Sequence, residues 1–241
     1  MKLYGKNPVL VRIKSNPKSI QRIMIAHGHP ELAYIGSKAR QHGLAINVVP
    51  RDQIDRVSQH HNAQGVFAVV DDFAYANFAD ILAQEGHKKP SLIFCDGLTD
   101  PQNLGGIIRS LASLGNFVVL LPTHDSVSVT EAVLRVACGG ENFVPVCLVR
   151  NLTQAVEKAR DAGYWIMGAV VQEGEDIRTT QIQFPAGIVI GSEDKGIRDV
   201  MRKRIDHAVT IPMRQKNLSF NVAHATAIFA YEICKQQNAG A

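Results

Sequence analysis

The second half of the chain alternates continuous apolar runs with helix-like segments. The apolar runs, each long enough for one strand, lie at residues 91–95, 117–121, 164–171, 187–191 and 208–211. The helical patterns lie at 104–114, 129–138, 152–162 and 219–235. Strands that are apolar on both faces are typical of a parallel sheet covered by helices. The pattern therefore predicts an α/β domain, with a further short strand expected at 143–146.

The first part of the chain has a weaker alternation of the same kind. Strands are expected at 23–26, 46–49 and 65–70, and helices at 31–42 and 52–60. Between the two parts, the segment 77–90 loses the strand pattern and ends in Gly86-His87-Lys88-Lys89-Pro90, which is typical of an exposed connection. We therefore expect a small α/β domain at 1–76, a linker at 77–90 and a larger domain at 91–241.

Composition narrows the class of protein. Hydrophobic residues make up 46% of the 241 residues and charged residues 20%, as in an ordinary globular protein. The net charge of +4 permits an RNA partner without requiring one. No apolar stretch has the length of a signal peptide or of a membrane span, so a cytoplasmic protein without a membrane partner is expected. The four cysteines form no C-x-x-C pair and have no zinc-like spacing to histidine, which predicts reduced thiols and no metal.

The chemistry of such a fold is expected at one edge of the sheet. Open parallel sheets bind ligands beyond the carboxyl ends of their strands. The loops after Cys95, Gly191 and Ile211 are all rich in polar residues, and the first two contain glycine. The first of them lacks a G-x-G-x-x-G pattern, which argues against a nicotinamide site.

Several polar residues in these loops also have ordinary structural explanations. Asn103 and Ser219 are each candidates for the N-cap of a helix. Arg109 has the place of a solvated or ion-paired side chain on a helix, and Glu193 has that of an acid favoured near a helix N-terminus. Asn221 is harder to explain inside a first helical turn, because Asn is a mediocre helix former.

Taken together, the three loops resemble the motifs of the SpoU family of RNA ribose 2'-O-methyltransferases, in the SPOUT class. The first motif, D-P-x-N-L-G-x-x-x-R, matches residues 100–109, and the second, G-S-E-x-x-G, matches 191–196. The third, I-P-M followed by S-x-N-V, matches within 211–222. The N-terminal part resembles the ribosomal-protein-L30e-like substrate domain of the branch that methylates guanosine in 23S rRNA.

The resemblance implies a fold and an activity. The fold would be a trefoil-knotted α/β domain with a parallel sheet, preceded by a small L30e-like α/β domain. The activity would be transfer of a methyl group from S-adenosylmethionine to a ribose 2'-hydroxyl, by a homodimer and without metal. A guanosine in 23S rRNA is the favoured substrate. A tRNA ribose, or a catalytically weak RNA-binding paralogue acting in ribosome assembly, are the alternatives.

The resemblance also implies roles for particular residues. The cofactor would lie against Gly191, Ile211 and Phe220. The catalytic set would be Asn103, Arg109, Glu193, Ser219 and Asn221. The family proposal makes Arg109 the base for the 2'-hydroxyl, yet a guanidinium does not readily lose a proton. The alternative is that Arg109 clamps an RNA phosphate while a phosphate or water accepts the proton.

Three positions depart from the third motif. Gln215 stands where the family has Gly, Phe220 where it has Leu, and Ala223 where it has a second Ser. Gln215 matters most, because a Gln would be strained if the loop required a positive φ there.

Overall fold

Contacts between Cα atoms divide the chain into two compact units. The computed structural model describes residues 1–58, 62–84, 89–192, 195–215 and 218–239. The first unit combines Met1–Ala74 with Val129–Asn142, and the second combines Tyr75–Ser128 with Phe143–Ala241. The smaller unit is therefore built from two separate stretches of the sequence.

The first unit contains a mixed four-stranded sheet in the order β1-β4-β2-β3. β4 is antiparallel to β1 and β2, whereas β2 and β3 are parallel. The strands are β1 (Lys2–Tyr4), β2 (Ile20–Ala26), β3 (Ile46–Val49) and β4 (Val66–Val70). The helices are α1 (Lys6–Ser15), η1 (Pro17–Ser19), α2 (Leu32–Gln41), α3 (Arg51–Val57), α6 (Glu131–Ala137) and η2 (Gly140–Asn142). The expected small α/β fold is present, with an additional N-terminal strand and helix.

One core of this unit lies between the sheet and α3. Its buried side chains include Met24, Ile54 and Phe67, and the ring of Tyr4 meets that of Phe67 edge-on at 5.6 Å between centroids. Burial and a hydrogen bond to Glu131 raise the pKa of Tyr4 to about 12, so its hydroxyl stays protonated at neutral pH. The apolar alternation of the strands therefore places an aromatic pair from β1 and β4 in this core.

The segment Val129–Asn142 packs within the first unit, although it follows β6 of the other sheet. The hydroxyl of Tyr4 donates to Glu131 at 3.1 Å. The Arg12 guanidinium pairs with Glu141 at 3.1 Å, and the two side chains are only 8% and 0% exposed. Gly139 has a φ of +98°, and a Cβ there would lie 2.7 Å from Val11. A buried ion pair and a close backbone approach thus fasten this segment to α1.

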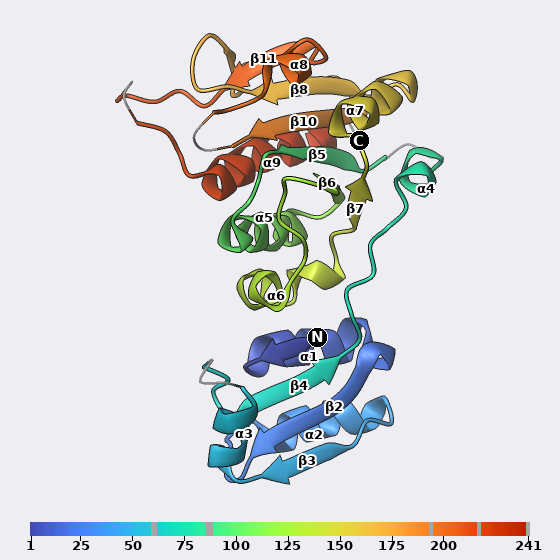
Figure 1. Cartoon of the computed structure of the whole chain (residues 1–241), viewed down its shortest axis with the longest axis vertical. Coiled ribbons are helices and arrows are strands. Elements are labelled where there is room, and N and C mark those ends of the chain that lie inside the picture. The colour runs from blue at the N-terminus through green and yellow to red at the C-terminus, as the bar shows by residue number, and fades with distance from the viewer. Residues whose placement is uncertain (59–61, 85–88, 193–194, 216–217, 240–241) are drawn as a thin grey trace. The chain divides into compact units, whose positions relative to one another are not determined.

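The second unit contains a seven-stranded sheet in the order β7-β6-β5-β10-β8-β11-β9, and every pair in it is parallel. The strands are β5 (Ser91–Asp96), β6 (Phe117–Pro122), β7 (Val146–Val149), β8 (Trp165–Ala169), β9 (Glu175–Asp176), β10 (Ala186–Gly191) and β11 (His207–Thr210). The parallel sheet predicted from the continuous apolar runs is therefore confirmed (Figure 1).

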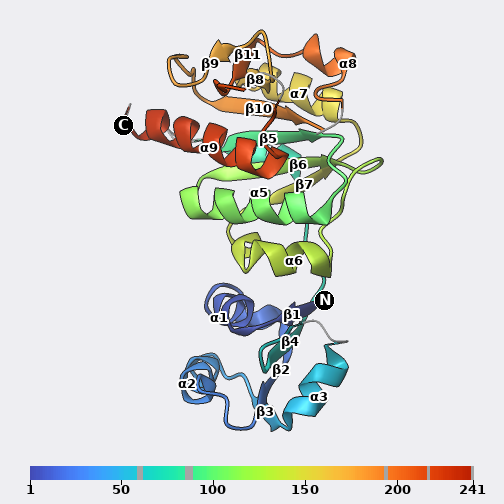
Figure 2. The same cartoon turned by 90° about the vertical axis from the view of Figure 1, so that its left-hand side faces the viewer.

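Helices cover both faces of this sheet. They are α4 (Phe78–Leu82), α5 (Pro101–Leu114), α7 (Leu152–Asp161), α8 (Asp199–Arg202) and α9 (Val222–Ala239). α7 packs its buried face, including Val156, on Leu92 and Phe94 of β5. α5 and α9 lie side by side, as Figures 1 and 2 show. Ile93 and Cys95, which alternate with the residues under α7, are fully buried as well.

Two of the boundaries that differ from those expected have a clear local cause. The strand predicted at 143–146 is wrong, because β7 runs from Val146 to Val149 and Phe143 is 60% exposed. Pro145 has no N–H to donate to the ladder, so the strand begins after it. α5 starts three residues earlier than expected, at Pro101, because Asp100 caps it and proline suits the first helical position.

Candidate active site

A pocket of about 450 Å³ opens beyond the carboxyl ends of β8, β10 and β11. Its wall comes from the residues after β8 at 169–173, after β10 at 190–192 and 195–197, and after β11 at 210, 211 and 213. Residues 219, 220, 222, 225 and 229 at the start of α9, together with Arg202, complete it. Pockets of ~300–1,000 Å³ suit small organic ligands. The site therefore lies at the edge of the sheet where parallel folds hold ligands.

All three residues predicted to hold the cofactor line this pocket. Gly191 ends β10, Ile211 follows β11, and Phe220 precedes α9 with 43% of its surface exposed. Ser219, predicted as catalytic, lines the pocket too. The fold thus brings together four residues that lie up to 29 positions apart in the sequence.

Gly191 sits at a close approach of two backbone segments. A Cβ at this position would collide with the carbonyl carbon of Gly196, which no side chain tolerates. Ser192 donates its N–H to the Gly196 carbonyl at 3.2 Å and accepts the Gly196 N–H at 2.9 Å. The loop is therefore folded back on itself, and only glycine leaves room for that shape.

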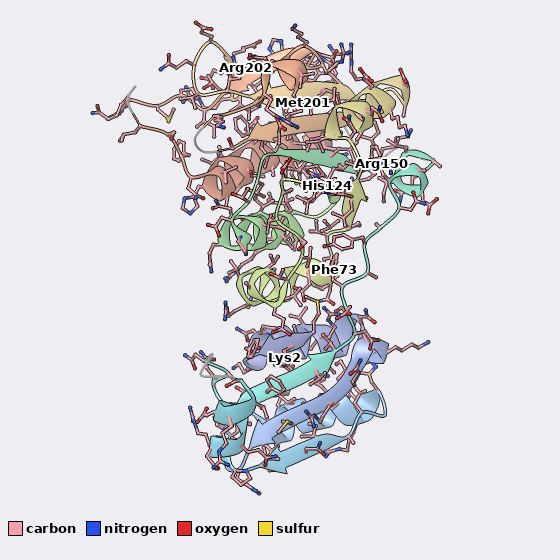
Figure 3. The ribbon with its side chains drawn as sticks, viewed as in Figure 1. Lys2, Phe73, His124, Arg150, Met201 and Arg202 are labelled. Carbon is pink, nitrogen blue, oxygen red and sulfur yellow. The ribbon has the colours of Figure 1, made fainter. Side chains whose placement is uncertain are left out.

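Charged side chains reach a pocket whose walls are otherwise largely apolar. Lys195, Glu173 and Arg202 all line it. Arg202, labelled with its neighbour Met201 in Figure 3, ends α8 and donates its Nε–H to the Ile197 carbonyl at 3.2 Å. The pocket can accordingly meet both apolar and ionic parts of a ligand.

Two asparagines join the beginnings of α5 and α9. Asn221 is the N-cap of α9, because its Oδ1 accepts the Ala223 N–H at 3.0 Å. Its Nδ2 donates to Oδ1 of the buried Asn103 at 2.8 Å. The structure therefore explains Asn221 as a cap that also holds a predicted site residue.

The two capping roles suggested for Asn103 and Ser219 are wrong. Asp100 caps α5 by accepting the Gln102 N–H at 2.8 Å, which leaves Asn103 in the first turn, directed at Asn221. α9 begins at Val222, so Ser219 lies before the cap. In both cases the true cap is another polar residue close by. Asp100 lies three residues before Asn103, and Asn221 lies two residues after Ser219.

Arg109 stands apart from the pocket. It lies two turns into α5, it is exposed, and it does not line the cavity. Among the described residues, none pairs with its guanidinium. Gly106, one turn before it, faces Ala223 of α9, and a Cβ there would be 3.1 Å from that of Ala223. Arg109 therefore presents an uncompensated positive charge close to where α5 meets α9.

A buried carboxylate that the sequence argument missed organises the loop after β10. Asp96 ends β5 opposite Gly191, and its side chain is fully buried. It accepts the backbone N–H of Arg198 at 3.0 Å and the Nε–H at 2.7 Å, and it pairs with the guanidinium at 2.6 Å. The place of Asp96 at the end of a buried strand was a usable signal, but nothing in the sequence indicates Arg198 as its partner.

Two further expectations have plain outcomes. Glu193 lies outside the described residues. Gln215 does not have a positive φ, so the strain expected from a Gln in place of Gly is absent.

Burial raises the pKa of the Cys95 thiol, next to Asp96, so this cysteine offers no thiolate to the site.

Metal ligands and membrane-spanning helices were also sought in the described part of the chain. There, no group of three or more His, Cys, Asp or Glu side chains is arranged to hold a metal ion. Over the same residues, no helix combines the length and the apolar character needed to cross a membrane.

Comparison with known proteins yields two family matches. Residues 90–231 match the model of the SpoU rRNA Methylase family. Residues 2–76 match the model described as RNA 2'-O ribose methyltransferase substrate binding.

Individual relatives agree with these matches. An uncharacterized tRNA/rRNA methyltransferase of Synechocystis is 32% identical over 98% of this chain, which spans 62% of that relative. The 23S rRNA (guanosine-2'-O-)-methyltransferase RlmB of Pseudomonas syringae is 31% identical over 99% of this chain and 96% of its own length. The crystal structure of the SpoU methyltransferase AviRb from Streptomyces viridochromogenes, in complex with the cofactor AdoMet, shares 22% identity with this chain. It superposes with a TM-score of 0.78, covering 100% of this chain and 91% of that one.

Proposed function

Because the chain belongs to the SpoU rRNA methylase family, we propose that it is an S-adenosylmethionine-dependent RNA methyltransferase that modifies a ribose 2'-hydroxyl. The observation that carries this proposal is the pocket beyond β8, β10 and β11. Gly191, Ile211 and Phe220, which the motif resemblance assigns to the cofactor, all line it.

The residues of the pocket fit S-adenosylmethionine. Gly191 and the paired residues Ser192 and Gly196 line the pocket, so a flat group can lie against backbone that carries little side chain. Ile211, Phe220 and Phe229 supply apolar surface for an adenine ring. Glu173 and Lys195 offer opposite charges for the ammonium and the carboxylate of the methionine part.

The transfer requires an activated oxygen aligned with a methyl group. When bound, S-adenosylmethionine would supply an electrophilic methyl group on a sulfonium, and loss of that methyl would leave a neutral thioether. The ribose 2'-oxygen forms the new C–O bond and loses its proton to an RNA phosphate or to water. Holding the two reactants in line can supply much of the rate enhancement.

We assign the positioning of RNA to Arg109 and the polar residues around it. The exposed and unpaired guanidinium of Arg109 is suited to clamp an RNA phosphate by two parallel hydrogen bonds. Asn103 and Asn221, joined at 2.8 Å, hold the ends of α5 and α9 in register beside it. Ser219 lines the pocket and would contact the ribose, and Glu193 would anchor the loop after β10.

The favoured substrate is a guanosine in 23S rRNA, with residues 1–76 binding the RNA. The support is the match of residues 2–76 to the substrate-binding family and the 31% identity to the enzyme named for 23S rRNA guanosine. Other relatives carry names that include both tRNA and rRNA, so a tRNA ribose is the second candidate.

We further propose that the protein acts as a homodimer through α9. Ile228 and Tyr231 on this helix are 37% and 61% exposed, and Leu218 and Phe220 before it are 61% and 43% exposed. Apolar side chains gathered on one element commonly mark a contact with another chain. A dimer would bring a second copy to Arg109, near the contact of α5 with α9. The trefoil knot and a cytoplasmic location stay predictions.

Calorimetry and methyl transfer test the activity together. We expect the purified protein to bind S-adenosylmethionine and its demethylated product without added metal. Single-turnover reactions on 23S rRNA and tRNA transcripts, read as 2'-O-methylated nucleosides by mass spectrometry, should show transfer to rRNA. The absence of heat and of thermal stabilisation with both compounds, with and without RNA, would contradict the assignment.

A catalytically weak RNA-binding paralogue is the second candidate function. Gln215 and Ala223 favour it by departing from the family motif. The ordinary φ of Gln215 removes part of that support. Tight RNA binding together with cofactor binding but no methyl transfer would identify this alternative.

A further inference from the structure

The stretch from α1 to α2 carries a strong local excess of positive charge. Residues 6–41 contain seven Lys or Arg side chains and one carboxylate, Glu31. The basic residues are Lys6, Arg12, Lys14, Lys18, Arg22, Lys38 and Arg40. Arg12 is neutralised by the buried Glu141, and Lys6 by Glu31 at 2.9 Å. The other five remain to attract an anionic partner.

An exposed aromatic ring lies between two of these lysines. Tyr34, on the first turns of α2, is 45% exposed. The Nζ of Lys14, from α1, is 5.9 Å from its ring centroid, and the Nζ of Lys38, one turn along α2, is 6.0 Å away. An exposed ring flanked by cations matches the way proteins hold single-stranded nucleic acid.

Neither lysine is satisfied by an acid. Lys38 reaches only the neutral side chain of Gln41, at 3.3 Å. Over the described part of the chain, no carboxylate comes within ion-pair distance of Lys14 or Lys38. A pairing carboxylate would have competed with phosphate, so both charges are available to a nucleic acid backbone.

We propose that Tyr34, Lys14 and Lys38 form a platform for an unpaired nucleotide of the RNA substrate. The ring of Tyr34 stacks on one base, and the two lysines contact the phosphates on either side of it. Unpaired rather than duplex RNA is implied, because the face of a paired base is covered by its neighbours in the stack. This inference rests on the proposed function for its RNA, and it adds a specific binding site in the first unit.

The ring and the charges can be tested separately in the full-length protein. The probe is a short fluorescent oligouridine, with the same strand annealed to its complement as comparison. Tyr34→Phe should keep single-strand affinity, because the flat ring remains. Tyr34→Leu keeps apolar contact without the flat face, and it should lose about 5-fold to 150-fold in affinity, since stacking contributes ~1–3 kcal/mol per base. Duplex binding should change little in either variant.

The contribution of the two lysines is measured by the salt dependence of RNA binding. Lys14→Gln and Lys38→Gln should each lower the slope of log affinity against log salt by about 0.7, the value for one phosphate contact in single strands. Arg51→Gln is the matched control, because it removes an exposed cation on α3 in the same unit. It should leave the loss of affinity caused by Tyr34→Leu unchanged. Irradiation of an iodouridine-containing strand should cross-link the peptide that contains Tyr34.

The outcomes separate this site from the rest of the proposal. Equal affinity of Tyr34→Leu and Tyr34→Phe for the single strand would overturn the proposal that the ring stacks on a base. Equal losses of affinity for single-stranded and duplex RNA would overturn it as well. The ring would then only separate the two lysines. Calorimetric binding of S-adenosylmethionine should be identical in all variants, because the pocket belongs to the other unit. Failure of the parent protein to methylate any RNA would reject the proposed function instead.

Discussion

Arg109 ends the first motif and Arg198 follows the second by two residues, but the structure uses their charges differently. Arg198 is tied to the buried carboxylate of Asp96, whereas Arg109 is exposed and pairs with none of the described residues. A guanidinium that the protein already satisfies serves the fold. One that the protein leaves unpaired and exposed on a helix is available to a substrate phosphate. This contrast supports the proposal that Arg109 binds a substrate phosphate.

Replacing Arg109 by lysine should separate charge from geometry. Lysine keeps the positive charge and loses the planar fork of donors. If Arg109 clamps a phosphate, we expect single-turnover methyl transfer at saturating RNA to fall by ~10² to 10³, which corresponds to about 3 to 4 kcal/mol of transition-state stabilisation. Cofactor affinity should be unchanged. Turnover close to that of the parent would refute the clamp, while the fold and the cofactor site would stand.

The Asp96–Arg198 pair predicts an asymmetry between its two partners. Arg198→Met removes the cation and leaves the buried carboxylate of Asp96 uncompensated, so we expect a loss of about 3–5 kcal/mol in the free energy of unfolding. Asp96→Asn leaves an arginine whose side chain is already 58% exposed and can turn to water, so the loss should be about 1–3 kcal/mol. Urea titration of both variants measures the difference, and equal losses would show that Asp96 is not buried as described.

At the scale of elements, Gly191 determines whether β10 and its loop can form the pocket. A methyl group at 191 would meet the backbone of Gly196, which cannot move aside as a flexible side chain would. We expect Gly191→Ala to cost ~1–3 kcal/mol, as overpacking does, and to weaken S-adenosylmethionine binding by about 5-fold to 150-fold. Calorimetry with the purified variant provides the measurement.

Gly36→Ala is the matched control for this substitution. Gly36 lies inside α2, and a Cβ there meets only ordinary contacts, at 3.6 Å from Arg40 and 3.8 Å from Ile46. Alanine favours a helix over glycine by up to ~1 kcal/mol, so this variant should be at least as stable as the parent. Retained cofactor binding in Gly191→Ala would show that the loop is wider in solution than the structure has it.

The sequence predicts the elements better than their ends. Continuous apolar runs identify the strands of the parallel sheet, because burial on both faces demands apolar residues at every position. The same runs place Gly191 and Ile211 at one edge. The shift of β7 past Pro145 and the caps at Asp100 and Asn221 depend on local hydrogen bonds, which residue types alone leave ambiguous. The pairing of Asp96 with Arg198, 102 positions away, required the fold itself.

At the scale of the whole molecule, compact units and continuous stretches of sequence do not coincide. The helical pattern at 129–138 was recognisable, but nothing in it indicates that Glu141 would meet Arg12, 129 positions earlier. The partners of α6 and η2 are β1 and α1, so Val129–Asn142 folds with residues that precede the methylase motifs. An excised C-terminal fragment would carry this segment without the residues it packs on, so full-length variants are the better test of each unit.

Arg12→Met in the full-length protein tests whether α6 and α1 fold as one body. The Glu141 side chain is fully buried, so loss of its cation should destabilise the first unit by about 3–5 kcal/mol. Replacing both residues by methionine should restore most of that loss, because no charge is then left buried. Hydrogen exchange read by mass spectrometry should show Lys6–Ser15 and Glu131–Ala137 losing protection together, at a denaturant concentration where Ser91–Asp96 and Ala186–Gly191 stay protected. If Glu131–Ala137 keeps its protection while Lys6–Ser15 opens, this helix belongs with the parallel sheet and the division into two units is wrong.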